Sequence, residues 1–126
     1  MKTIITTEKA PEPLGPYSQA VLTGNTLYTS GQIAINPETG KLVIDNIKSE
    51  TLQVMENLSA VLEAAGMTFN HVIKSSIFIS NMDDFLVINE VYGSFFEDEN
   101  APARETVQVA RLPKDVNVEI SMIAIK

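Results

Sequence analysis

The sequence contains no cysteine and a single histidine, His71. Without cysteine there is no disulfide bond, no thiolate nucleophile and no cysteine-based metal site. One histidine leaves little material for a metal centre or for a serine–histidine catalytic pair. We therefore expect a protein whose chemistry uses neither a metal ion nor a thiol.

Basic residues are also few. The chain has nine Lys and Arg against sixteen Asp and Glu, a formal net charge of −7. The cations are scattered, so the surface repels phosphate backbones and we expect no nucleic-acid partner. No apolar run is long enough to span a bilayer, and the N-terminus lacks a signal-peptide pattern, so we expect a cytoplasmic protein without a membrane partner. Glycine-rich phosphate loops are absent, and the acidic runs match no metal-binding loop.

What remains is the composition of one globular domain. The 126 residues are 44% hydrophobic, enough for one core, and they show no linker or repeat, so we expect a single domain over 1–126. Alternation at a period of two predicts most of the strands, and turn residues separate them. The predicted extended segments are Lys2 to Thr6, Gln19 to Leu22, Thr26 to Ile35, Leu42 to Ile44, His71 to Ser80, Glu105 to Arg111 and Asn117 to Ile125.

Two segments have helical periodicity. The first helix is expected to begin after Asp45 or Asn46, either of which can cap it, and to end at Gly66 in a left-handed turn. Its predicted apolar stripe consists of Leu52, Met55, Leu58, Leu62 and Ala65. The second helix follows a cap at Asn81, Asp83 or Asp84, with an apolar face of Phe85, Ile88, Tyr92 and Phe95.

The order of elements predicts an α+β fold with both helices on one face of a mixed sheet. In the last strand, one face carries Val116, Val118, Ile120 and Met122, while Ile123 and Ile125 lie on the other. Apolar residues on both faces indicate that the second face is buried against another subunit, so we expect a homo-oligomer.

Arg104 and Glu119 are the strongest candidates for chemistry, on two alternating segments that flank a Leu-Pro-Lys-Asp turn. On neighbouring strands, a guanidinium can grip a carboxylate while a carboxyl group manages a proton beside it. The alternative for Arg104 is an ion pair with Glu105 or Glu119. Glu119 can equally point to solvent, although burial would raise its pKa.

Four other residues are candidates with structural alternatives. Tyr17, on a Gly-Pro loop, either lines a pocket or covers the edge of the core. Ser30 and Gly31 interrupt an apolar strand, which indicates a bulge or the close approach of a ligand. Asn89, beside the apolar face of the second helix, either orients a ligand or lies on the surface.

Several motifs together resemble the RidA/YjgF family of reactive-intermediate deaminases. They are G-P-Y-S-Q at 15–19, T-S-G-Q-I at 29–33, E-A-A-G at 63–66, A-P-A-R at 101–104, V-A-R-L-P-K-D-V at 109–116 and V-E-I at 118–120. The resemblance covers essentially the whole chain. It implies a chorismate-mutase-like α+β fold and a homotrimer whose sheets form a central barrel, with clefts between subunits.

The same resemblance implies roles for individual residues. Arg104 would grip the substrate carboxylate, and Glu119 would hold and activate water. Tyr17, Ser30, Gly31 and Asn89 would line the cleft, together with the backbone at Thr106. Many relatives carry cysteine at the place of Thr106, so its absence here argues against a thiol-based role.

The implied activity is the hydrolysis of short 2-imino acids, such as 2-iminobutanoate and 2-iminopropanoate, to 2-keto acids and ammonia without a cofactor. One alternative is a regulatory trimer that binds keto acids without turnover. Another is an endoribonuclease or translation inhibitor, an activity attributed to some relatives, against which the acidic surface counts.

Overall fold

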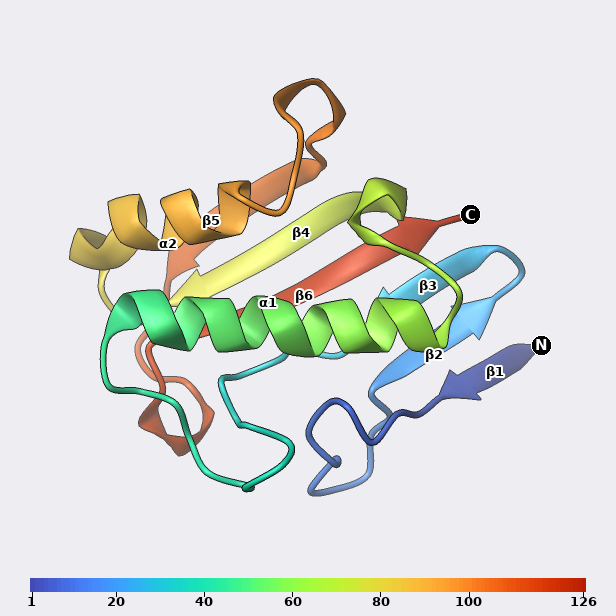
Figure 1. Cartoon of the computed structure of the whole chain (residues 1–126), viewed down its shortest axis with the longest axis horizontal. Coiled ribbons are helices and arrows are strands. Elements are labelled where there is room, and N and C mark those ends of the chain that lie inside the picture. The colour runs from blue at the N-terminus through green and yellow to red at the C-terminus, as the bar shows by residue number, and fades with distance from the viewer.

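The computed structural model describes residues 1–126 as one six-stranded mixed sheet with two helices packed on one face (Figure 1). The α+β class and the single-faced helix layer predicted from the sequence are confirmed. The elements are β1 (Lys2–Ile5), β2 (Ala20–Thr23), β3 (Thr26–Thr29), α1 (Ile47–Ala64), β4 (Val72–Ile79), α2 (Phe85–Gly93), β5 (Ala103–Gln108) and β6 (Val118–Ile125).

The strand order is β1-β2-β3-β6-β4-β5. The first three strands form an antiparallel meander, and β6 returns between β3 and β4, antiparallel to both. Only β4 and β5 run parallel, and α2 forms part of the crossover that a parallel pair requires. The predicted adjacency of the Arg104 and Glu119 strands is wrong, because β4 lies between β5 and β6.

Helix α1 begins as the sequence predicts. The Asn46 side chain accepts a hydrogen bond from the Ser49 N–H at 2.8 Å, and Gly66 has the expected left-handed conformation at φ 72°. One residue of the predicted stripe is misplaced: Leu52 is 42% exposed, whereas Val54 and Val61 are fully buried. At 100° per residue, Leu52 falls at the edge of the buried face rather than at its centre.

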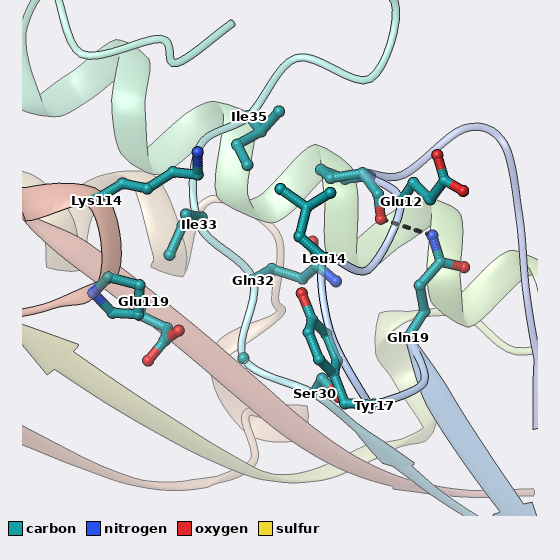
Figure 2. A pocket seen from close by; sticks show the side chains of 13 residues that line it. Glu12, Leu14, Tyr17, Gln19, Ser30, Gln32, Ile33, Ile35, Lys114 and Glu119 are labelled. Carbon is teal, nitrogen blue, oxygen red and sulfur yellow. Dashed lines mark hydrogen bonds between the residues drawn. The ribbon is translucent and has the colours of Figure 1, made fainter. Parts of the chain in front are cut away.

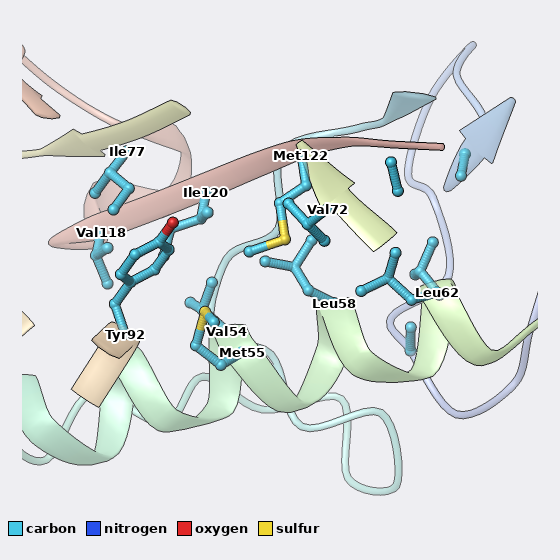
Figure 3. Close-up of a cluster of buried hydrophobic side chains, with 14 of the residues drawn as sticks. Val54, Met55, Leu58, Leu62, Val72, Ile77, Tyr92, Val118, Ile120 and Met122 are labelled. Atoms are coloured by element: carbon cyan, nitrogen blue, oxygen red, sulfur yellow. The ribbon is translucent and has the colours of Figure 1, made fainter. Parts of the chain in front are cut away.

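The core lies between the sheet and the helices (Figure 3). It contains Ile77, Val118, Ile120 and Met122 from the sheet, and Val54, Met55, Leu58, Leu62 and Tyr92 from the helices. Alternate residues of β6 are buried from Val118 to Ala124, as a period of two requires. The residues between them, Glu119 among them, therefore point to the opposite face of the sheet.

No helix covers that opposite face of the sheet (Figure 1). Register places Ile4, Tyr28, Val107 and Ile125 on it, with 47%, 48%, 40% and 40% of their surface exposed. A row of half-exposed apolar residues across one face of a sheet is typical of a surface that another protein covers. The homo-oligomer stays a prediction, now with a defined surface.

The extended segment predicted over Leu42 to Ile44 is not a strand and makes only an isolated bridge at Leu42, and two other predicted strands have clearly different limits. The strand expected over Thr26 to Ile35 ends at Thr29, and beyond it Gln32 and Ile35 make only isolated bridges, to Ile120 and Leu42. The strand expected over Glu105 to Arg111 spans Ala103–Gln108 instead. In the first case the chain leaves the ladder at Ser30 and Gly31, where it bends around the Glu119 side chain. Neither helix is long and apolar enough to cross a membrane.

Candidate active site

Glu119 lies in a cavity of about 450 Å³ on the face of the sheet away from the helices (Figure 2). Three segments form its walls: the loop between β1 and β2, the chain that follows β3, and the turn that leads into β6. Four residues predicted for the site line this cavity together, namely Tyr17, Ser30, Gly31 and Glu119.

Glycine at position 31 is required by the position of the Glu119 side chain. A Cβ atom there would lie 2.8 Å from Cδ of Glu119 and 2.9 Å from its Cγ. Only a residue without a side chain allows the carboxyl group to lie this close to the backbone. The interruption of the apolar strand by Gly31 is therefore a close approach, as one of the two sequence interpretations held.

Burial raises the pKa of the Glu119 carboxyl above its usual range, because an ionised carboxylate is poorly solvated inside the cavity. The side chain makes no ion pair within the chain. A carboxyl group with a raised pKa binds a proton more readily than an ordinary carboxyl group, which suits it to proton transfer. The interpretation of Glu119 as a partly buried, proton-transferring group fits this environment better than a solvent-facing one.

The loop that carries Tyr17 is held by a buried amide. The Gln19 side chain accepts a hydrogen bond from the Thr7 N–H at 2.7 Å and donates one to the Pro11 carbonyl at 2.9 Å. The Ser30 hydroxyl donates to the Ser18 carbonyl at 2.5 Å, which ties the loop to the strand end. In Figure 2 the Tyr17 hydroxyl points into the cavity, so its ring forms a wall and does not cover the core.

Arg104 lies in a different place, over helix α2. Its guanidinium donates to the Asn89 side-chain oxygen, and its central carbon lies 5.4 Å from the Tyr92 ring centroid and 5.7 Å from that of Phe85. These contacts are cation–π interactions, which orient the planar group and leave its remaining donors available. Asn89, Tyr92 and Arg104 line a hollow of about 280 Å³.

No carboxylate neutralises Arg104. The ion pair suggested with Glu105 is excluded, because Glu105 binds Lys74 at 2.8 Å and accepts a hydrogen bond from Ser76 on the other face of the sheet. Glu119 does not pair with Arg104 either. The guanidinium therefore has the free charge and the fixed geometry that recognition of a ligand carboxylate requires.

Arg104 and Glu119 lie on opposite faces of the sheet. Arg104 is in register with Ser75, which is buried beneath the helices, whereas Glu119 is in register with Phe78, whose neighbours Ile77 and Ile79 point into the core. A small acid bound by Arg104 does not reach Glu119 of the same chain. The structure thus contains two half-sites, each with part of the predicted set.

Thr106 belongs to neither hollow. It is on the same face as Arg104, two residues along β5, and its hydroxyl oxygen is buried without a hydrogen-bond partner. Sequence reasoning missed Phe85 and Tyr92 as neighbours of Arg104, because their helical spacing indicated only core packing. It also missed Gln32 and Lys114 in the Glu119 cavity.

The turn before β6 has an unusual backbone. Lys114 and Asp115 both have positive φ, 56° and 57°, which costs about 1–3 kcal/mol for each residue that is not glycine. Two anchors hold the turn: Arg111 binds Asp115 through two hydrogen bonds, and the buried Glu50 accepts from the backbone and side chain of Asn117 at 2.7 and 2.8 Å. The Leu-Pro-Lys-Asp motif predicted a turn, but no local signal predicted this geometry.

No group of three or more His, Cys, Asp or Glu side chains is arranged to hold a metal ion. The polar groups of the Arg104 hollow are the guanidinium, the Asn89 amide, the Tyr92 hydroxyl and the Asp98 carboxylate. Those of the Glu119 cavity are carboxyl, hydroxyl, amide and ammonium groups.

The chain is similar in sequence, over its whole length, to several known proteins. Residues 7–126 match the family model described as Endoribonuclease L-PSP. A RutC family protein of Pyrococcus horikoshii is 53% identical over 100% of this chain and 99% of its own. A protein of Escherichia coli named 2-iminobutanoate/2-iminopropanoate deaminase is 44% identical, again over 100% and 99%.

Solved structures agree in fold. A Rid family protein of Yersinia pestis superposes with a TM-score of 0.97 at 45% identity, covering 100% of both chains. The structure of Escherichia coli TdcF with bound serine has a TM-score of 0.93 at 44% identity, over 98% of each chain. These similarities extend over the whole fold, including both half-sites.

Proposed function

The chain belongs to the Endoribonuclease L-PSP family, which includes the Rid and RutC proteins, and from that membership we propose that it hydrolyses reactive 2-imino acids to 2-keto acids and ammonia. The expected substrates are short, such as 2-iminobutanoate and 2-iminopropanoate. Deaminases of this name are 44% identical to the chain, while more similar archaeal relatives are known only by family.

One observation carries the proposal: the cation without an acid partner and the carboxyl group without a cation partner lie on opposite faces of the sheet. The face around Glu119 also carries the half-exposed apolar residues. β5 is an edge strand, so docking of the β5–α2 edge of one protomer on that face of its neighbour would bring Arg104 of the first to Glu119 of the second. We propose that the active site forms in this way, in a homotrimer.

The chemistry follows from the two groups. Arg104 binds the substrate carboxylate with parallel hydrogen bonds, which fixes the imine carbon above the cavity. Glu119 takes a proton from water as the water oxygen bonds to that carbon, and transfers it to the nitrogen. Glu119 next carries the proton of the new hydroxyl group to the nitrogen as the C–N bond breaks, so that ammonia leaves and the carbonyl group of the keto acid forms. General acid–base help of this kind contributes about 10²–10⁴-fold.

Ammonia release from freshly generated 2-iminobutanoate tests the proposal. We expect Arg104→Ala to abolish release while the oligomer persists in size-exclusion chromatography. Lys48→Ala, which removes an exposed cation that lines neither hollow, is the matched control and should keep full activity. Full activity in Arg104→Ala would show that this guanidinium has no such role.

A second candidate is carboxylate binding without turnover, which the serine in the TdcF structure favours. A pure anion site gains nothing from Glu119 near the bound carboxylate, and here the cavity is shaped around that residue. Calorimetric titration with 2-oxobutanoate separates the candidates. Binding by the unmodified protein without ammonia release from the imine would favour the second.

A further inference from the structure

The cavity around Glu119 contains a cation that the proposed hydrolysis does not use. Lys114 lines this cavity, and it forms neither of the two ion pairs of the chain, which join Lys74 to Glu105 and Arg111 to Asp115. Its ammonium also makes no hydrogen bond to another side chain or to the backbone. An unpaired charge at a concave site is available for a ligand.

The turn that places Lys114 at the cavity has a strained backbone. Lys114 and Asp115 adopt left-handed conformations that side chains other than glycine rarely take. The Asp115 carboxylate accepts from Arg111 at 2.5 and 3.1 Å, and the Asp115 N–H donates to the Leu112 carbonyl at 3.0 Å. Because both ends of the turn are anchored, its backbone conformation is fixed, and with it the position from which the exposed Lys114 side chain extends.

The Lys114 ammonium does not form an ion pair with the Glu119 carboxyl group. Burial raises the pKa of the Glu119 carboxyl. In Figure 2 the Lys114 side chain runs past Ile33 toward Ile35, away from Glu119. The ammonium therefore lies toward the far end of the cavity from the reacting group.

The remaining charged group of the cavity is Glu12, which is exposed on the facing loop. Between Glu119 and Lys114, much of the cavity wall is formed by the side chains of Leu14, Tyr17, Ile33 and Ile35. A ligand that extends from Glu119 toward Lys114 thus passes along an apolar wall and ends at a positive charge. A chain with an acidic end matches this order of groups.

We propose that Lys114 is a specificity-determining residue that selects 2-imino acids with an acidic side chain. Its ammonium binds the side-chain carboxylate, while Arg104 of the neighbouring protomer binds the carboxylate next to the imine. This inference rests on the proposed function and adds acidic 2-imino acids to its substrates, with tighter binding than the short acids that lack a second carboxylate. Reactions that oxidise an acidic amino acid at its α-carbon would supply such imines.

Binding of two stable product acids tests the proposal in the full-length oligomer. Calorimetry with 2-oxoglutarate and 2-oxobutanoate compares a ligand that has the second carboxylate with one that lacks it. For Lys114→Met, which keeps the length and the backbone strain, we expect 2-oxoglutarate to bind about 10- to 100-fold more weakly, the usual range for a lost charged hydrogen bond. Binding of 2-oxobutanoate should change by less than about twofold.

Two further variants separate charge from strain. Lys114→Arg keeps the charge and should retain most of the preference for 2-oxoglutarate. Lys114→Gly removes the charge but relieves the positive φ, so it should lose the preference while the protein melts at a higher temperature. Glu12→Gln removes the nearby negative charge and should strengthen 2-oxoglutarate binding.

Equal weakening of both ligands in Lys114→Met, or an unchanged preference, would overturn the assignment of Lys114. Ammonia release keeps this outcome distinct from failure of the proposed function. If the unmodified protein hydrolyses neither 2-iminobutanoate nor 2-iminoglutarate, the deaminase proposal fails, whereas the keto-acid titrations still decide the role of Lys114.

Discussion

Combining two inactive variants tests whether Arg104 and Glu119 act across a subunit boundary. Arg104→Ala retains the carboxyl half-site, and Glu119→Gln retains the guanidinium half-site. Each variant alone is expected to lose at least about 100-fold in activity, because one half of every site is missing. Mixed oligomers are different, since the intact Arg104 of a Glu119→Gln protomer can face the intact Glu119 of a neighbouring Arg104→Ala protomer and complete a site.

The recovered activity can be worked out from the arrangement of half-sites. When the two variants assemble at random in equal amounts, the guanidinium is intact with a probability of one half and so is the carboxyl group. About a quarter of all sites are then complete. If only oligomers that contain both variants are isolated, a cyclic trimer has one complete site in three and a dimer one in two, so activities of about 33% and 50% distinguish them.

Co-expression with two different affinity tags, followed by purification on both, isolates the mixed oligomers. Their ammonia release from 2-iminobutanoate is compared with that of the unmodified protein carrying the same tags. The control is a mixture of the two separately assembled variants, kept under conditions without subunit exchange, which should stay inactive. Doubly tagged oligomers as inactive as the single variants would refute the shared site and the packing on which it rests.

Three other predictions follow from single contacts. Gly31→Ala should lower kcat about 100-fold with little effect on folding, because the new Cβ displaces the Glu119 carboxyl by close to an ångström; steady-state ammonia release and circular dichroism check both parts. Glu119→Gln, compared in the Arg104→Ala background, should raise the melting temperature at pH 7, since the raised pKa means that the ionised carboxyl is penalised in the folded state. This gain should shrink as the pH falls through the raised pKa and disappear below about pH 4.3, the ordinary value; a constant gain would show that ionisation is not its cause. Tyr92→Phe should cost about 1–2 kcal/mol in urea unfolding, because the buried Ser75 hydroxyl loses its donor at 2.9 Å, yet keep most activity because the ring still packs against Arg104.

Local sequence patterns predicted most of the helices and strands, and the family motifs named candidate residues that the structure places in two hollows. Asn46 and Gly66 end α1 through contacts with residues a few positions away, so the signals are contained in the neighbouring sequence. The family motifs indicated Tyr17 and Gly31 without geometry, and the structure places both in the same cavity as Glu119. The sequence did not identify Lys114 as a cavity residue. A turn motif predicts where the backbone reverses, but not which cavity the side chains of the turn line.

The sequence by itself determined the α+β class, the capped helices and an apolar pattern on both faces of the last strand, since each depends on contacts within a short segment. The tertiary structure decided that β4 separates β5 from β6, that Arg104 and Glu119 point to opposite faces, and that the Glu119 carboxyl is buried. The reason is that a period of two defines only which residues of one strand share a face. Which strands become neighbours, and which face receives the helices, depends on pairing and packing between residues far apart in the chain.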